Sequence, residues 1–171
     1  MPFTPFHFGP GFLISLTFLS FIDIPTFLIA SVIIDLEPFL VLVFHLNCPL
    51  HGFFHSFLGG FLVAALFAVI MSKIRKNFTR LIIFFKIEQS FSFKKILFSS
   101  ICAIFLHILL DSPIYLDIRP FFPFEFNPFY RNTVMPGLIS YLICVWCFIG
   151  AILVYLFRLF QHKIKIRKLS I

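Results

Sequence analysis

The sequence predicts an all-α, polytopic integral membrane protein, a helical bundle with about five apolar spans of which the first two are short or re-entrant. Of its 171 residues, 60% are hydrophobic and only 12% are charged. The mean hydropathy is +1.04, and a soluble domain of this size could not bury so much apolar surface. The apolar residues also form runs of helical length, separated by Pro-rich or basic segments.

The first two apolar runs are shorter than the others. Residues 12–22 precede Asp23-Ile24-Pro25, which ends a helix, and residues 26–34 precede Asp35-Leu36-Glu37-Pro38. A full crossing needs about 20 residues, so residues 12–34 form either two short spans or a re-entrant hairpin. Asp35 and Glu37 cannot share one face of a helix, but a turn before Pro38 would let their carboxylates converge.

Three longer runs follow within this single membrane domain. We expect a helix over residues 57–71 that begins a turn earlier, near His51, a helix over residues 96–110, and a last helix over residues 138–160. Residues 73–95 form a basic, interrupted connection. Residues 112–133 form a loop rich in Pro and aromatic residues, which suits the depth of lipid headgroups.

The basic residues indicate topology. The net charge of +7 is concentrated in residues 73–95 and in the tail, residues 161–171. Because both clusters flank apolar runs, they indicate cytoplasmic segments and not a nucleic-acid interface. This places the loop 112–133 outside the cytoplasm and gives a multi-pass protein of the cell membrane, with its N-terminus outside and its C-terminus in the cytoplasm.

Two pairs of polar residues lie at the predicted outer ends of the helices. His51 and His55 are four residues apart, and so are His107 and Asp111. At that spacing two side chains share one face of a helix, and an imidazole beside lipid is costly, so we expect both pairs to face inward. The topology was derived from the charges alone, and it still brings the two pairs to the same side.

Further polar residues are predicted to join these pairs. An imidazole and carboxylate set is typical of a divalent metal site, for zinc first and otherwise for manganese or iron. With one position left to water, such a metal would lower the pKa of that water to about 7. Asp35 and Glu37 are the catalytic candidates, and Glu37 is either a ligand or the general base. The predicted metal ligands are His7, Asp35, His51, His55, His107 and Asp111.

The same motifs resemble a known family. An early His7, the pair Asp35 and Glu37, the stretch His51-Gly52-x-x-His55-Ser56 and the pair His107-x-x-x-Asp111 together resemble the predicted membrane-bound metal-dependent hydrolases, which include LexA-regulated inner-membrane proteins. The resemblance implies a helical inner-membrane protein with a metal site and hydrolase activity. The family motif commonly reads H-R-G-x-T-H-S, whereas here Gly52 directly follows His51 and Phe54 stands in place of Thr.

The predicted function is therefore a membrane-embedded metal-dependent hydrolase at the extracytoplasmic interface. A site among Phe and Pro residues at headgroup depth would meet a lipid or another amphiphile, so we expect a phosphoester or related bond as substrate. The expected partners are the lipid bilayer and this substrate, not nucleic acid. Two alternatives remain open: a non-catalytic protein whose His and Asp cluster is structural, and a metal-binding or transport protein, for which only Asp23 lies on the opposite side.

Overall fold

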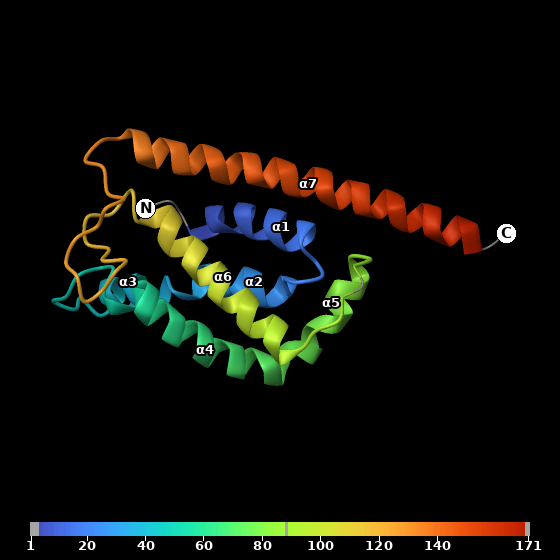
Figure 1. Cartoon of the computed structure of the whole chain (residues 1–171), viewed down its shortest axis with the longest axis horizontal. Coiled ribbons are helices and arrows are strands. Elements are labelled where there is room, and N and C mark those ends of the chain that lie inside the picture. The colour runs from blue at the N-terminus through green and yellow to red at the C-terminus, as the bar shows by residue number, and fades with distance from the viewer. Residues whose placement is uncertain (1–3, 88, 170–171) are drawn as a thin grey trace.

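The computed structural model describes residues 4–87 and 89–169, and every regular element within these ranges is a helix (Figure 1). The all-α prediction is confirmed. The elements are η1 (Thr4–His7), α1 (Phe8–Thr17), α2 (Ile24–Ile33), α3 (Leu36–Val43), η2 (Phe53–His55), α4 (Phe57–Ile74), η3 (Arg75–Phe78), α5 (Thr79–Phe84), α6 (Phe93–Asp111) and α7 (Met135–Leu169).

Four stretches of the described chain are long and apolar enough to cross a membrane: Ile24–Val43, Phe57–Phe84, Phe93–Asp111 and Met135–Ile164. Only 17% of the apolar window in the last stretch is buried inside the protein. Trp146 of α7, for example, is 67% exposed. Apolar surface of this extent requires a lipid environment, so the chain is a membrane protein.

The first two apolar runs differ from each other in the structure. α1 has only 10 residues, so the prediction of a short first run is confirmed. The second run continues across a turn at Ile34 and Asp35 into α3, and together α2 and α3 form the 20-residue stretch that is long enough to span. Asp23 starts α2 by accepting a hydrogen bond from the backbone N–H of Thr26, at 3.3 Å.

The helices pack side by side, and α6 lies between two of them. α6 contacts α2 on one side and α4 on the other, while α1 lies between α2 and α7 (Figure 1). The core between α2, α4 and α6 combines large side chains with alanines, among them Phe27, Ala68, Ala103 and Ile104. α1 approaches α7 closely because Gly9 lacks a side chain: a Cβ at this position would lie 2.3 Å from the carbonyl oxygen of Cys144.

Successive long helices alternate in direction, so the bundle has two chemically different ends (Figure 1). One end collects the start of α1, the turn between α2 and α3, the segment before α4 and the end of α6. This end carries the predicted site. The other end carries α5 and a buried ion pair in which Nε of Arg75 lies 2.7 and 2.8 Å from the two carboxylate oxygens of Asp23.

Candidate metal centre

The His51 to His55 stretch is not α-helical, and the prediction that α4 begins near His51 is wrong. His55 ends the short 3-10 helix Phe53–His55, and α4 begins only at Phe57. Ser56 has an extended backbone and its hydroxyl accepts a hydrogen bond from the N–H of Gly59 at 3.0 Å, which caps α4 there. The two imidazoles nevertheless remain close, with ring centroids 4.8 Å apart.

His55 is held by the acidic pair that precedes α3. Asp35 lies in the turn and Glu37 in the first turn of α3, and both carboxylates face the ring of His55. Nδ1 of His55 lies 2.7 Å from Oε2 of Glu37, and Nε2 of His55 lies 3.9 Å from Oδ1 of Asp35. Burial acts to lower the pKa of His55, but the neighbouring carboxylates of Asp35 and Glu37 outweigh it, so the pKa is raised.

His107 lies at the centre of the cluster. Its Nδ1 lies 2.7 Å from the carbonyl oxygen of Ser31 and therefore carries the proton, because a carbonyl can only accept. Its Nε2 is left facing two carboxylates, 3.2 Å from Oδ1 of Asp35 and 3.4 Å from Oδ2 of Asp111. The predicted sharing of a helix face by His107 and Asp111 is thus confirmed, because α6 is regular as far as Asp111.

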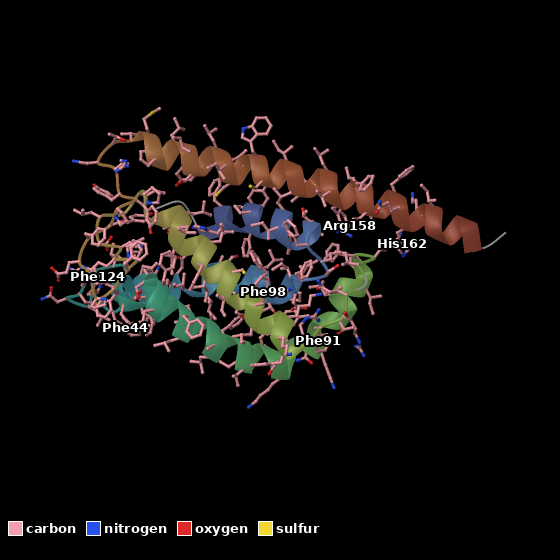
Figure 2. The ribbon with its side chains drawn as sticks, viewed as in Figure 1. Phe44, Phe91, Phe98, Phe124, Arg158 and His162 are labelled. Atoms are coloured by element: carbon pink, nitrogen blue, oxygen red, sulfur yellow. The ribbon has the colours of Figure 1, made fainter. Side chains whose placement is uncertain are left out.

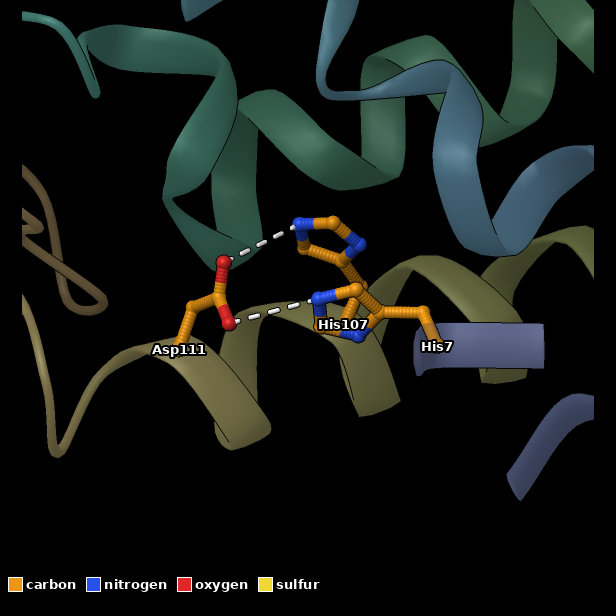
Figure 3. Close-up of side chains that lie close together, drawn as sticks. All are labelled: His7, His107 and Asp111. Carbon is orange, nitrogen blue, oxygen red and sulfur yellow. Dashed lines mark ion pairs between the residues drawn. The ribbon is translucent and has the colours of Figure 1, made fainter. Parts of the chain in front are cut away.

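His7 completes the cluster from the start of α1. Its ring stacks on that of His107 with the centroids 4.1 Å apart. Its Nε2 lies 3.4 Å from Oδ1 of Asp111, so the carboxylate of Asp111 faces both imidazoles (Figure 3). All three side chains are buried, although they come from opposite parts of the sequence.

These contacts produce two groups that could each hold a metal ion. One consists of His7, His107 and Asp111, and the other of Asp35, His55 and His107. In each group the ligand atoms lie within 4.8 Å of one another. Ligands bound to zinc at about 2.0–2.2 Å are themselves about 3.0–3.5 Å apart, so a small contraction would suffice.

The donor atoms themselves fit a metal. A buried nitrogen or oxygen normally has a hydrogen-bond partner, because leaving one unsatisfied costs about 1–3 kcal/mol. Among the described residues, several buried atoms of the cluster face one another at 3.2–3.9 Å or have no polar neighbour, and none forms a directed hydrogen bond. All belong to predicted ligands: Nδ1 and Nε2 of His7, Nε2 of His55, Nε2 of His107 and Oδ1 of Asp111. A cation among these atoms would satisfy several of them at once.

His51 lies beside this cluster and in neither of the two groups. Its Nδ1 and its backbone N–H both face Asp117, at 3.0 Å from Oδ1 and Oδ2 respectively. Burial acts to raise the pKa of Asp117, but the hydrogen bonds from His51 outweigh it, so the pKa is lowered. The predicted assignment of His51 as a metal ligand stays a prediction.

Two residues near the cluster were missed by sequence reasoning. Asp117 pairs with His51, while the nearby Arg119 binds Glu125 at 2.9 Å. Tyr115 stacks near His51, with centroids 4.3 Å apart, and its buried hydroxyl has no hydrogen-bond partner. Burial and nearby carboxylates raise the pKa of Tyr115. The position of both residues just after His107-x-x-x-Asp111 was the only available signal.

A cleft of about 520 Å³ opens beside the cluster. Polar groups line it on the cluster side, among them Glu37, His51 and Asp117, with Arg119 also in its wall. The rest of the lining is largely apolar and includes Phe53 and Phe122. A cleft of this volume and lining could admit an amphiphile with a polar group directed at the cluster.

No known protein family, curated protein or solved structure matches this chain. Its function therefore has to be inferred from the geometry of the site.

Proposed function

We propose that this protein is an integral membrane hydrolase that uses a divalent metal ion at the extracytoplasmic surface of the inner membrane. In this proposal the N-terminus lies outside and the C-terminus in the cytoplasm. The substrate is a lipid or another amphiphile, cleaved at a phosphoester or related bond. Zinc is the first candidate for the metal, and manganese or iron are the others.

One observation carries the proposal: five buried nitrogen and oxygen atoms of His7, His55, His107 and Asp111 gather in one cluster without forming directed hydrogen bonds. A cluster that only locked a helical bundle would gain stability by joining these atoms in short, directed hydrogen bonds. Here Nε2 of His7 lies 3.4 Å from Oδ1 of Asp111, and Nε2 of His55 lies 3.9 Å from Oδ1 of Asp35. The proposal gives them a common partner. The resemblance to membrane-bound metal-dependent hydrolases depends on the same residues.

The surroundings of the histidines also favour metal binding. A histidine ligand usually donates its second ring N–H to a carboxylate or carbonyl, which fixes the ring and the tautomer. Three imidazoles here have such a partner at Nδ1: Glu37 for His55, Asp117 for His51 and the carbonyl of Ser31 for His107. In each case Nε2 of the imidazole is left to bind a metal ion.

The residues around the metal would have separate tasks. A bound divalent ion would supply Lewis acidity and lower the pKa of water to about 7. The cleft would hold the apolar part of the substrate against Phe53 and Phe122. Tyr115 keeps its proton at neutral pH and can donate a hydrogen bond to an anionic group. Oε1 of Glu37 accepts a hydrogen bond from the N–H of Phe54 at 3.3 Å, and Oε2 faces His55. These two contacts favour a role for Glu37 in orienting His55. Asp35 remains the candidate for both metal ligand and catalytic residue.

The transport alternative has less support. A path for metal ions would need polar groups beyond the cluster, and Asp23 is a buried carboxylate at the opposite end of the described structure. Both of its oxygens lie within 2.8 Å of Nε of Arg75, so this carboxylate is already neutralised. A non-catalytic structural cluster is the second alternative, and it predicts no bound metal.

The proposal is tested by elemental analysis of the full chain purified in detergent. His107 belongs to both potential metal groups, so His107→Ala should lose the metal that the wild type carries. His45→Asn is the matched control, because His45 is exposed and asparagine tolerates its left-handed backbone (φ 48°). Metal-dependent release of a headgroup from lipid phosphoesters, lost in His107→Ala only, supports hydrolysis. Absence of metal after reconstitution with zinc, manganese or iron contradicts the proposal.

A further inference from the structure

We propose that the end of the bundle opposite the metal centre binds one anionic phospholipid. Its acyl chain would lie in an apolar groove between α1, α2, α5 and α7, and its phosphate would lie beside Lys86, Arg158 and His162. This site is separate from the proposed hydrolase site and does not depend on it.

The groove has a volume of about 430 Å³, within the range of about 300–1,000 Å³ that is common for small-ligand sites. Its walls come from four helices, with Leu16 of α1, Leu28 of α2, Leu81 of α5 and Ile152 of α7 among the lining residues. Nearly all of its lining is aliphatic or aromatic. A hydrocarbon chain satisfies such a surface without needing any hydrogen bond.

A second, smaller pocket of about 220 Å³ adjoins the groove and has the opposite character. The two share Ile87 and Tyr155 in their walls, so they are neighbours on the surface. The smaller pocket contains three basic side chains, Lys86, Arg158 and His162, and no acidic one among its described lining residues. Figure 2 shows Arg158 and His162 on α7, near the ends of α1 and α5.

Arg158 is fixed in place by the end of α1. Its Nε donates to the carbonyl of Leu16 at 2.7 Å, and one terminal nitrogen donates to the carbonyl of Thr17 at 3.3 Å. These carbonyls lie in the last turn of α1, where helices leave acceptors without internal partners. Since guanidinium has five N–H donors, Arg158 can still bind a phosphate while it holds α1.

The boundary between the pockets has the features of a headgroup position. Tyr155 donates its hydroxyl to the carbonyl of Phe85 at 3.1 Å, and tyrosine is enriched where hydrocarbon meets polar headgroups. Lys86 follows Phe85 in the sequence and has a left-handed backbone (φ 57°) because it ends α5: its N–H donates to the carbonyl of Ile83 at 2.8 Å, and that of Ile87 donates to the carbonyl of Ile82 at 3.1 Å. The apolar groove, Tyr155 and the basic side chains thus lie in the order expected for the acyl chain, the glycerol region and the phosphate of a phospholipid.

Charge complementarity favours an anionic phospholipid over a zwitterionic one. Basic groups at a membrane surface attract anionic lipids, and each Lys or Arg contributes about a fivefold gain in affinity. We therefore expect the full chain in detergent to bind phosphatidylglycerol at least about fivefold more tightly than phosphatidylcholine with the same acyl chains, as measured by native mass spectrometry.

Variants at the two pockets test both halves of the site. Lys86→Gln should abolish most of the preference for phosphatidylglycerol, whereas Lys73→Gln, at an exposed lysine outside both pockets, should keep it. Lys86 is exposed, so its replacement should leave the fold intact. Arg158 also holds the end of α1, so Arg158→Gln serves only to support the result obtained with Lys86→Gln. Leu81→Trp should weaken the binding of both lipids by narrowing the groove.

Three outcomes would overturn the inference. Equal binding of the two lipids would remove the role of the cations. If both Lys86→Gln and His162→Gln keep the preference for phosphatidylglycerol, the selectivity comes from residues outside this pocket. Equal thermal protection by inorganic phosphate alone and by phosphatidylglycerol would reduce the site to an anion pocket without a lipid chain.

Discussion

Oε2 of Glu37 lies 2.7 Å from Nδ1 of His55, and this contact joins the first turn of α3 to the segment that precedes α4. Glu37 therefore determines how the imidazole of His55 is turned. With Nδ1 held by the carboxylate, Nε2 of His55 is directed into the cluster, where Asp35 and His107 also lie.

Replacing Glu37 by Gln should weaken metal binding without abolishing it. Loss of an orienting partner typically costs about 10–100-fold in metal affinity, because the ligand is no longer held in position. Metal titration of the metal-free protein would measure the change. His55→Ala should lose the metal site formed with Asp35 and His107 altogether. If both variants lose metal equally, Glu37 is itself a ligand.

Gly52→Ala should lower the metal affinity in the same way as Glu37→Gln. A Cβ at Gly52 would lie 2.7 Å from Oε1 of Glu37, so a methyl group there would push the carboxylate away from His55. Gly137→Ala is the control, since a Cβ at Gly137 has no neighbour within 4 Å. Metal affinity should fall in the first variant and stay unchanged in the second. Unchanged affinity in Gly52→Ala would mean that the carboxylate can move without affecting the site.

Arg75→Met should destabilise the protein by about 3–5 kcal/mol, because it leaves Asp23 as an unpaired buried carboxylate. The two side chains are 1% and 0% exposed. Unfolding in a denaturing detergent would measure the free energy, with the exposed Arg80→Met as control. The double variant with Asp23→Asn should lose less than the sum of the single losses. Additive losses would show that the pair is not coupled.

The stability of the metal-free protein should fall as the pH rises. The pKa of His55 is raised in the folded state, so folding favours the protonated imidazole. This contribution is fully present below the unfolded pKa of about 6.5 and is lost as the pH rises through the folded value. Melting temperatures between pH 6 and 9 should show this, and His55→Gln should have a flatter profile.

Metal affinity should show the opposite dependence on pH. A metal ion binds the neutral imidazole and displaces its proton, so affinity should increase as the pH rises over the same range. Zinc titration at fixed ionic strength would measure it. A metal affinity independent of pH would contradict binding at His55.

Local patterns predicted part of this site correctly. His107 and Asp111 share a face because α6 is regular through both residues, and Asp35 and Glu37 converge because a turn and Pro38 interrupt the helix. The same spacing rule failed for His51 and His55. There the cap formed by Ser56 delays α4 until Phe57, and no count of apolar residues reports where a cap will form.

By itself the sequence determined that this is a helical membrane protein with its histidines and carboxylates near the ends of apolar runs, because hydropathy and spacing are local properties. Only the tertiary structure decided which of these groups meet. The stacking of His7 on His107, the pairing of His51 with Asp117 and that of Arg75 with Asp23 join separate helices and loops. Such contacts depend on how the helices pack, since packing alone fixes which buried polar atoms find a partner.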